Sequence, residues 1–336
     1  MNILLIQLKR IGDLVLTTPA IVALREKFPD AKITLVIGRE AAELLPAIPD
    51  IDNRLIASAA RTWLEIARGD FDYCIDFTRN DRSAFLVLLS RARKRIVSFR
   101  IKVRSKIRTR VYNEFVEHRM RDMHTADYHL ALLEPLGISK ASQAIQLHLP
   151  TNAREKADEL RKNYKIDNSF IVFHPGSARA EKFWEPQRWA EVIGHADKNY
   201  DVDLVLTGGT SSLEQSHLAE IKSKLRRPII DLSGKTDLLA LAALVAQARL
   251  LVTVDSAPMH LAAATRTPQV ILFGPTNPFH WRPRQSPALI LQGTSASPIT
   301  TFVSKQPRLP MNQISTQAVI DAMETLLSAP ATSPRL

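Results

Sequence analysis

Short runs of apolar and β-branched residues alternate with longer amphipathic segments along the whole chain. The runs are too short for buried helices, whereas the segments between them repeat their apolar residues at helical spacing. Such alternation predicts βαβ units, in which parallel strands carry helices on both faces of a sheet. The predicted strands are 2–8, 32–37, 54–56, 71–77 and 95–99 in the first half, and 170–174, 203–207, 229–232, 250–254 and 269–273 in the second.

Each half of the chain has its own set of strands, and 336 residues exceed what one hydrophobic core usually serves. The sequence therefore predicts an α/β protein with two Rossmann-like, doubly wound parallel-sheet domains that face a cleft. We place the domains at 1–150 and 151–313, because Pro150 breaks the chain before a charged helix that begins near Ala153. A helix over 314–328 and a flexible tail over 329–336 should follow.

Several classes of protein are excluded by simple counts. Cys74 is the only cysteine, so neither an internal disulfide nor a cysteine-based metal site is expected. The nine histidines are scattered without the paired spacing of metal ligands, so we expect no metal. The first residues lack the arrangement of a signal peptide. No apolar stretch reaches the roughly 20 residues of a spanning helix, which predicts a cytoplasmic protein.

The formal net charge of +11 is concentrated in one segment. Residues 91–110 contain ten basic side chains and no acidic one. From 101 to 110 the cations alternate with other residues, so an extended segment would place them on one face. That face is either a solvated edge or a contact with one anionic partner. Because Phe99 is its only aromatic residue, the segment lacks the stacking platform of a single-stranded nucleic-acid site.

Ligands of open parallel sheets bind outside the carboxyl ends of the strands, so the loops after the strands are the places to search. The first such loop contains Lys9, Arg10, Gly12 and Asp13. It matches neither the dinucleotide fingerprint G-x-G-x-x-G nor the P-loop, which disfavours both chemistries. Asp13 is then either a helix N-cap or a functional carboxylate.

Two loops of the second half have residues suited to a nucleotide. After strand 170–174, a Pro-Gly-Ser turn exposes backbone N–H groups, and Ser177 and Lys182 add a hydroxyl and a charge for a diphosphate. The alternative is an ordinary solvated loop. After strand 203–207, Gly208 and Gly209 open space, and Glu214 either accepts from ribose hydroxyls or is an exposed helix residue.

A fourth loop, after strand 250–254, has the strongest anion-binding features. Asp255 and Ser256 leave the strand, and Ala257 begins a helix whose first turn contains His260. Free N–H groups and the positive end of the helix dipole favour an anion there. The alternative is a capped helix with a satisfied histidine. Together the three loops predict a nucleotide-diphosphate pocket whose charge needs no metal.

Taken in order, these motifs resemble glycosyltransferase family 9, the bacterial lipopolysaccharide core heptosyltransferases, and within it the branch that adds a third heptose. The resemblance implies a GT-B fold of two Rossmann-like domains and an inverting, metal-independent transfer from ADP-heptose to the inner core of lipopolysaccharide. No cofactor is implied, since the nucleotide sugar is a substrate. The matching segments are KRIGDLVLTTPAI (9–21), HPGSARAEKFWEPQRWAEVI (174–193), LTGGTSSLEQ (206–215), LSGKTDLLALAALVAQARLLVTVDSAPMHLAAA (232–264) and FGPTNPFHWRP (273–283).

Carried over by position, Asp13 resembles the general base and Lys182 the main diphosphate contact. Glu214 matches a ribose-contacting carboxylate only approximately. Many relatives have Thr-Gly or Ser-Gly where this chain has Ser256-Ala257. The resemblance also implies an acceptor site in the first domain. The residues assigned to the donor are Ser177, Lys182, Gly208, Gly209, Glu214, Asp255, Ser256, Ala257 and His260, and those assigned to the acceptor are Lys9, Arg10, Arg100, Lys102, Arg104 and Arg108.

The expected partners are ADP-heptose or a related nucleotide sugar, the lipopolysaccharide core and an anionic membrane surface, with no nucleic acid. We therefore expect a protein peripheral to the inner face of the cytoplasmic membrane. Two other functions remain open from the residues alone. One is a sugar-nucleotide epimerase with two Rossmann domains, and the other is a non-enzymatic protein that binds anions or membrane surfaces.

Overall fold

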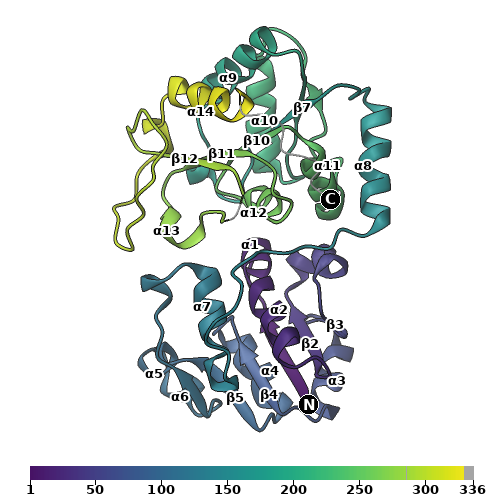
Figure 1. Ribbon diagram of the computed structural model, residues 1–336, viewed down its shortest axis with the longest axis vertical. Coiled ribbons are helices and arrows are strands. Elements are labelled where there is room, and N and C mark those ends of the chain that lie inside the picture. Colours follow the sequence, from purple (N-terminus) through teal and green to yellow (C-terminus); the bar gives the residue numbers. More distant parts are fainter. Residues whose placement is uncertain (285, 329–336) are drawn as a thin grey trace. The chain divides into compact units, whose positions relative to one another are not determined.

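The computed structural model describes residues 1–284 and 286–328, so the predicted tail 329–336 lies outside the described residues (Figure 1). The chain divides into two compact units, Met1–His148 and Leu149–Leu336. Each unit is built on a six-stranded parallel sheet. This confirms the prediction of two Rossmann-like domains.

The sheet of the first unit has the order β3-β2-β1-β4-β5-β6. Ile3 of β1 lies opposite Ile33 of β2 on one side and Tyr73 of β4 on the other. From Ile3 to Ile6 the central strand is completely buried, because helices cover both faces of the sheet. The strands are β1 (Asn2–Gln7), β2 (Lys32–Ile37), β3 (Asn53–Ile56), β4 (Tyr73–Asp76), β5 (Lys94–Ser98) and β6 (Glu114–Val116).

The helices of the first unit vary in length, and several are single turns. They are α1 (Ile11–Val15), α2 (Thr18–Lys27), α3 (Ala60–Arg68), α4 (Asp81–Ser90), α5 (Arg100–Arg104), α6 (Lys106–Thr109) and α7 (Thr125–Ala131), with the 3-10 helices η1 (Arg39–Ala47), η2 (Met120–Asp122) and η3 (Glu134–Leu136). Asn80 and Ser83 form a capping box at the start of α4, which fixes where that helix begins.

The second unit repeats the architecture in the order β12-β11-β10-β7-β8-β9. Its strands are β7 (Phe170–His174), β8 (Asp203–Leu206), β9 (Ile230–Asp231), β10 (Leu250–Val254), β11 (Gln269–Phe273) and β12 (Ala288–Gln292). Its helices are α8 (Thr151–Asn163), α9 (Pro186–Asn199), α10 (Ser212–Lys224), α11 (Leu238–Gln247), α12 (Ala257–Ala264), α13 (Pro278–Trp281) and α14 (Thr316–Ser328), with η4 (Ala180–Lys182) and η5 (Met311–Gln313). Trp184 and Trp189 are fully buried in its core.

The chain reverses its direction of winding between β1 and β4 in the first unit and between β7 and β10 in the second. Such switch points leave a crevice beyond the carboxyl ends of the two strands, and ligands bind there. The segment that follows β1 contains Asp13, and the segments after β7 and β10 contain Lys182 and Asp255. The fold therefore places the predicted site residues at its two switch points.

Two local predictions are wrong. The expected extended segment 101–110 is helical, because Ser105 ends α5 and its hydroxyl accepts from the Arg108 N–H at the start of α6. The apolar periodicity over 14–28 predicts a single helix, but the chain forms α1 and α2 there, because Pro19 in the first turn of α2 has no N–H to donate to the preceding turn. Sequence reasoning also missed the edge strands β6 and β12.

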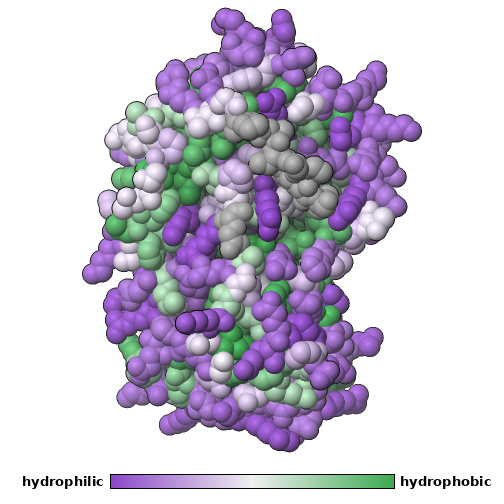
Figure 2. All heavy atoms as spheres, in the orientation of Figure 1, coloured by the Kyte–Doolittle hydropathy of each residue, from purple (hydrophilic) through white to green (hydrophobic). Residues whose placement is uncertain are grey.

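No helix in the described part of the chain is long and apolar enough to cross a membrane. Hydrophilic residues cover most of the face shown in Figure 2, and the apolar residues on it are scattered.

Candidate active site

The Lys182 ammonium and the Asp255 carboxylate form a buried ion pair at the switch point of the second unit. Lys182 ends η4, and Asp255 directly follows β10. Lys182 Nζ donates to Asp255 Oδ2 at 2.6 Å and to the Asp255 carbonyl at 2.8 Å. The Thr276 hydroxyl donates to the same carboxylate oxygen. Asp255 thus fixes the direction of the Lys182 ammonium and leaves one of its three protons for an anion.

Glu214 lies in the first turn of α10 and is buried, so it is not the exposed helix residue that the sequence left open. The Ser211 hydroxyl caps α10 by accepting from the Glu214 N–H at 3.3 Å. A Cβ atom added to Gly176 or Gly209 would fall on the Glu214 carboxylate. The absence of a side chain at these two glycines therefore lets two strand-end loops lie against the Glu214 carboxylate in its present position.

Two buried histidines flank this region, and both are held in the neutral form. Burial lowers the pKa of His174 and of His260 to about 4. His174 Nδ1 shares a hydrogen bond of 2.9 Å with the Thr207 hydroxyl, and its Nε2 lies 3.6 Å from Glu214 Oε1. His260 can therefore donate to a phosphate only as a neutral tautomer. Its buried Nδ1 has no hydrogen-bond partner among the described residues.

Helix α12 begins with free backbone donors. Ser256 is its N-cap, but the Ser256 side chain makes no capping hydrogen bond. The hydroxyl instead lies 3.4 Å from the Thr253 hydroxyl and from the Val254 carbonyl. Because Pro258 has no N–H, the donors of this first turn belong to Ala257 and the residues after Pro258. This arrangement suits an anion, as the sequence predicts.

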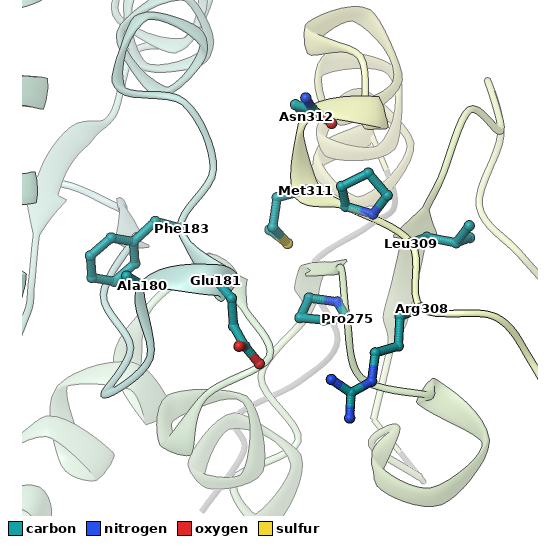
Figure 3. A pocket seen from close by; sticks show the side chains of 9 residues that line it. Ala180, Glu181, Phe183, Pro275, Arg308, Leu309, Met311 and Asn312 are labelled. Carbon is teal, nitrogen blue, oxygen red and sulfur yellow. The ribbon is translucent and has the colours of Figure 1, made fainter.

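A pocket of about 480 Å³ adjoins η4, the helix that ends at Lys182. Figure 3 shows the Glu181 and Arg308 side chains reaching into it from opposite sides, with Phe183 and Met311 on its walls. Its volume is within the roughly 300–1,000 Å³ of small-molecule sites. Sequence reasoning missed this pocket. The search covered only the loops directly after the predicted strands, and Arg308 and Met311 lie well beyond the loop that follows the last of them, 269–273.

Asp13 is a buried carboxylate in the first unit with an unused oxygen. It lies in the first turn of α1, whose N-cap is Arg10, so the N-cap interpretation of Asp13 is wrong. Asp13 is 7% exposed, and its Oδ1 accepts no hydrogen bond from the described residues. Lys9 Nζ lies 3.7 Å from Oδ1. Burial raises the pKa of Asp13, and Lys9 opposes that rise. A carboxylate with a free lone pair and a raised pKa suits a general base.

The end of β4 and the loop after it hold residues that sequence reasoning missed. Asp76 is fully buried and accepts four hydrogen bonds, from the N–H groups of Thr78 and Arg79 and the hydroxyls of Ser83 and Tyr112, at 2.6–3.0 Å. The Thr78 hydroxyl accepts from the Leu8 N–H at 2.7 Å, which ties this loop to the one before Asp13. The only available signal was the position of Asp76 near the end of a predicted strand.

The predicted acceptor residues do not form one cationic face. Lys102 stacks its ammonium 3.9 Å from the Phe115 ring centroid. Arg108 donates to the Arg79 carbonyl at 3.0 Å and pairs with Asp81 at 3.2 Å. Arg104 is exposed at the end of α5, and Arg100 is half-buried at its start. Arg10, by contrast, directly precedes the helix that holds Asp13.

The described residues contain no group of three histidine, cysteine, aspartate or glutamate side chains that could hold a metal ion.

The fold and these strand-end sites define a GT-B type glycosyltransferase. A solved glycosyltransferase family 9 protein from Veillonella parvula superposes with a TM-score of 0.84 at 26% identity, covering 97% of both chains. Escherichia coli ADP-heptose lipopolysaccharide heptosyltransferase II superposes with a TM-score of 0.78 at 20% identity, covering 97% of this chain and 98% of that one. The second likeness concerns the fold alone.

The family follows from the sequence match. The profile of glycosyltransferase family 9 (heptosyltransferase) matches residues 59–309, and the chain belongs to this family. Lipopolysaccharide heptosyltransferase 3 of Escherichia coli K12 is 29% identical over 81% of this chain and 82% of its own length. The core heptosyltransferase OpsX of Haemophilus influenzae is 25% identical over 84% and 81%. All the predicted donor residues lie within the matched range, whereas Asp13 precedes it.

Proposed function

We propose that this protein is an inverting, metal-independent glycosyltransferase that moves heptose from ADP-heptose to the inner core of lipopolysaccharide. The observation that carries the proposal is the buried Lys182–Asp255 pair at a strand-end crevice within the range that matches the family. Relatives named lipopolysaccharide heptosyltransferase 3, at 27% and 29% identity, favour addition of a third heptose.

On the donor side, negative charge develops on the diphosphate as it leaves. The remaining proton of Lys182 and the first-turn N–H groups of α12 are fixed before the reaction, so they stabilise that charge without reorganising. Ser177 and neutral His260 add further hydrogen-bond donors. Glu214, held against Gly176 and Gly209, supplies acceptors for ribose hydroxyls. Solved heptosyltransferases WaaC of Escherichia coli, one with ADP and one with ADP-2-deoxy-2-fluoro heptose, support this donor class.

On the acceptor side, Asp13 takes the proton from the attacking hydroxyl as that oxygen bonds to the anomeric carbon and the bond to ADP breaks. Lys9 and Arg10 directly precede α1, which holds Asp13, and provide positive charge for an acidic acceptor. A solved relative, the heptosyltransferase TibC, is described as iron-containing. Here the residues described above supply the charge that a metal would, which is why we propose a metal-independent reaction.

The experiment that tests the reaction is incubation with ADP-heptose and a panel of truncated core acceptors, with product mass as the readout. We expect heptose added to one acceptor and ADP released in equal amount. Free heptose formed without any acceptor would instead favour an epimerase or a hydrolase.

The proposed base has its own test in Asp13→Asn. We expect kcat to fall by about 10²–10⁴-fold, because general-base catalysis contributes that much, while ADP-heptose binding stays unchanged. Asp30→Asn, at an exposed turn, is the matched control. Near-normal transfer by Asp13→Asn would rule out its role as base.

We also propose that the protein works at the inner face of the cytoplasmic membrane, where an acceptor of this kind is reached, and that it does not act on nucleic acid.

A further inference from the structure

Helices α5 and α6 present two apolar side chains to solvent among cations. Val103 and Ile107 are each 79% exposed, whereas Ile101 of the same segment is buried in the core. These helices follow β5 at the edge region of the first sheet (Figure 1). At this exposure, Val103 and Ile107 bury little apolar surface and so contribute little to the stability of these two single-turn helices. We call this segment, residues 100–110, the basic ridge.

A second set of exposed apolar residues lies on the same face of the sheet. The crossovers from β3 to β4, β4 to β5 and β5 to β6 all run in one direction along the sheet, so α3, α4 and α5 cover one face. Their inward residues share one hydrophobic cluster. On the outside, Trp63 of α3 meets Phe85 of α4 with ring centroids 5.5 Å apart, and both are nearly half exposed. Leu64 and Leu88 are more exposed still.

Apolar tips surrounded by lysine and arginine are the pattern of a surface that lies in a bilayer interface. The tips enter the boundary between headgroups and acyl chains, and the long cationic side chains remain with the anionic headgroups. Lys102, Arg104, Lys106 and Arg110 are all exposed on the basic ridge, and residues 100–110 include no acidic side chain. Nucleic acid would be bound by the cations alone, and a protein partner would be expected to contact a continuous apolar patch. Neither accounts for two isolated, exposed apolar side chains, Val103 and Ile107, between cations.

We infer that the basic ridge docks the protein on an anionic lipid bilayer, with Val103 and Ile107 inserted among the headgroups. The Trp63–Phe85 pair then rests on the same interface. This inference deepens the membrane-surface part of the proposed function by naming the surface and the chemistry of its partner.

The test is co-sedimentation of the full chain with vesicles of phosphatidylglycerol and phosphatidylcholine, compared with phosphatidylcholine alone. We expect binding to the anionic vesicles only. The variant V103S/I107S should bind at least tenfold more weakly, because it removes the inserted groups. The variant K106Q/R110Q should bind about thirtyfold more weakly, or about 2 kcal/mol, at about 1 kcal/mol per cation. Only the charge effect should shrink at high salt.

The controls are V303S, a single apolar-to-serine change, and K224Q/R226Q, which removes the same number of cations; both are at exposed positions of the second unit and should bind as wild type. Circular dichroism confirms that each variant is folded. Wild-type binding by V103S/I107S, or no vesicle binding by the wild type, overturns the inference. Binding of an oligonucleotide that both ridge variants lose, without vesicle binding, would assign the ridge to nucleic acid instead.

Transfer to a lipid-free core oligosaccharide separates this inference from the proposed function. V103S/I107S should transfer heptose to that acceptor at the wild-type rate. A wild type that binds vesicles but transfers nothing would contradict the proposed function and leave the docking surface standing.

Discussion

The buried ion pair in the second unit predicts that Lys182→Met is both unstable and weak in nucleotide binding. The side chains of Lys182 and Asp255 are 10% and 8% exposed, and their charged atoms are 2.6 Å apart. Removing one partner leaves a buried charge without compensation, which costs about 3–5 kcal/mol. We therefore expect the free energy of unfolding to fall by that amount in Lys182→Met.

The chain offers a matched control in Lys222 and Asp231, whose charged atoms are also 2.6 Å apart but whose side chains are 36% and 29% exposed. Because solvent screens such a pair, Lys222→Met should cost about 1 kcal/mol or less. Burial, not distance, then accounts for the difference between the two variants.

The assay is urea unfolding followed by fluorescence and by far-UV circular dichroism, together with calorimetry of ADP binding. In the double variant Lys182→Met, Asp255→Asn the buried charge is gone, so most of the lost stability should return while ADP affinity stays low. Equal destabilisation by Lys182→Met and Lys222→Met would refute the reasoning on burial. Recovery of ADP affinity in the double variant would refute the role of Lys182 as an anion contact.

Two further predictions concern the same unit. Gly176→Ala should lower ADP affinity at least tenfold, because the added Cβ displaces the Glu214 carboxylate. Calorimetry measures this affinity. The control Gly194→Ala, whose added Cβ meets no atom within 4 Å, should bind ADP normally. Because the folded pKa values of His174 and His260 are about 4, below the ordinary value near 6.5, the unfolded chain takes up protons first on acidification. The stability they provide is complete above about pH 6.5 and is lost as pH falls toward 4, by about 2 kcal/mol per histidine between pH 7 and pH 5. Urea midpoints at the two pH values check this, and a His260→Gln variant with an unchanged pH dependence would contradict it.

The strands were predictable because parallel strands buried on both faces are continuous apolar runs, as β1 and β10 are. The same rule fails for β6, an edge strand that begins with the half-exposed Glu114. The period-two pattern of the basic ridge did not predict its helices, for a different reason. Helices of one turn are too short to develop a 3.6-residue pattern, and the Ser105 cap between them is a single-residue signal.

For the candidate site, residue types and strand-end positions predicted Lys182, Asp255 and Glu214 as candidates, but not how these side chains are arranged. No motif indicates that Asp255 would pair with Lys182, which is 73 residues away. Likewise Asp76 and Tyr112 are 36 residues apart in the sequence, and the fold of the first sheet brings their side chains into a hydrogen bond. Contacts between distant residues depend on the packed fold, so a single sequence does not reveal them.

The hydrogen bonds of Asp76 limit which residues of the proposed acceptor side could serve as a base. Asp76 ends β4 beside β1, the strand that leads to Asp13, so two carboxylates stand at neighbouring strand ends. The lone pairs of Asp76 accept hydrogen bonds from two backbone N–H groups and two hydroxyls. Loss of any of these hydrogen bonds would destabilise the loop after β4. If Asp13 is the base, as we propose, Asp76 could not replace it, because the lone pairs of Asp76 already hold its loop, whereas Oδ1 of Asp13 accepts no hydrogen bond from the described residues.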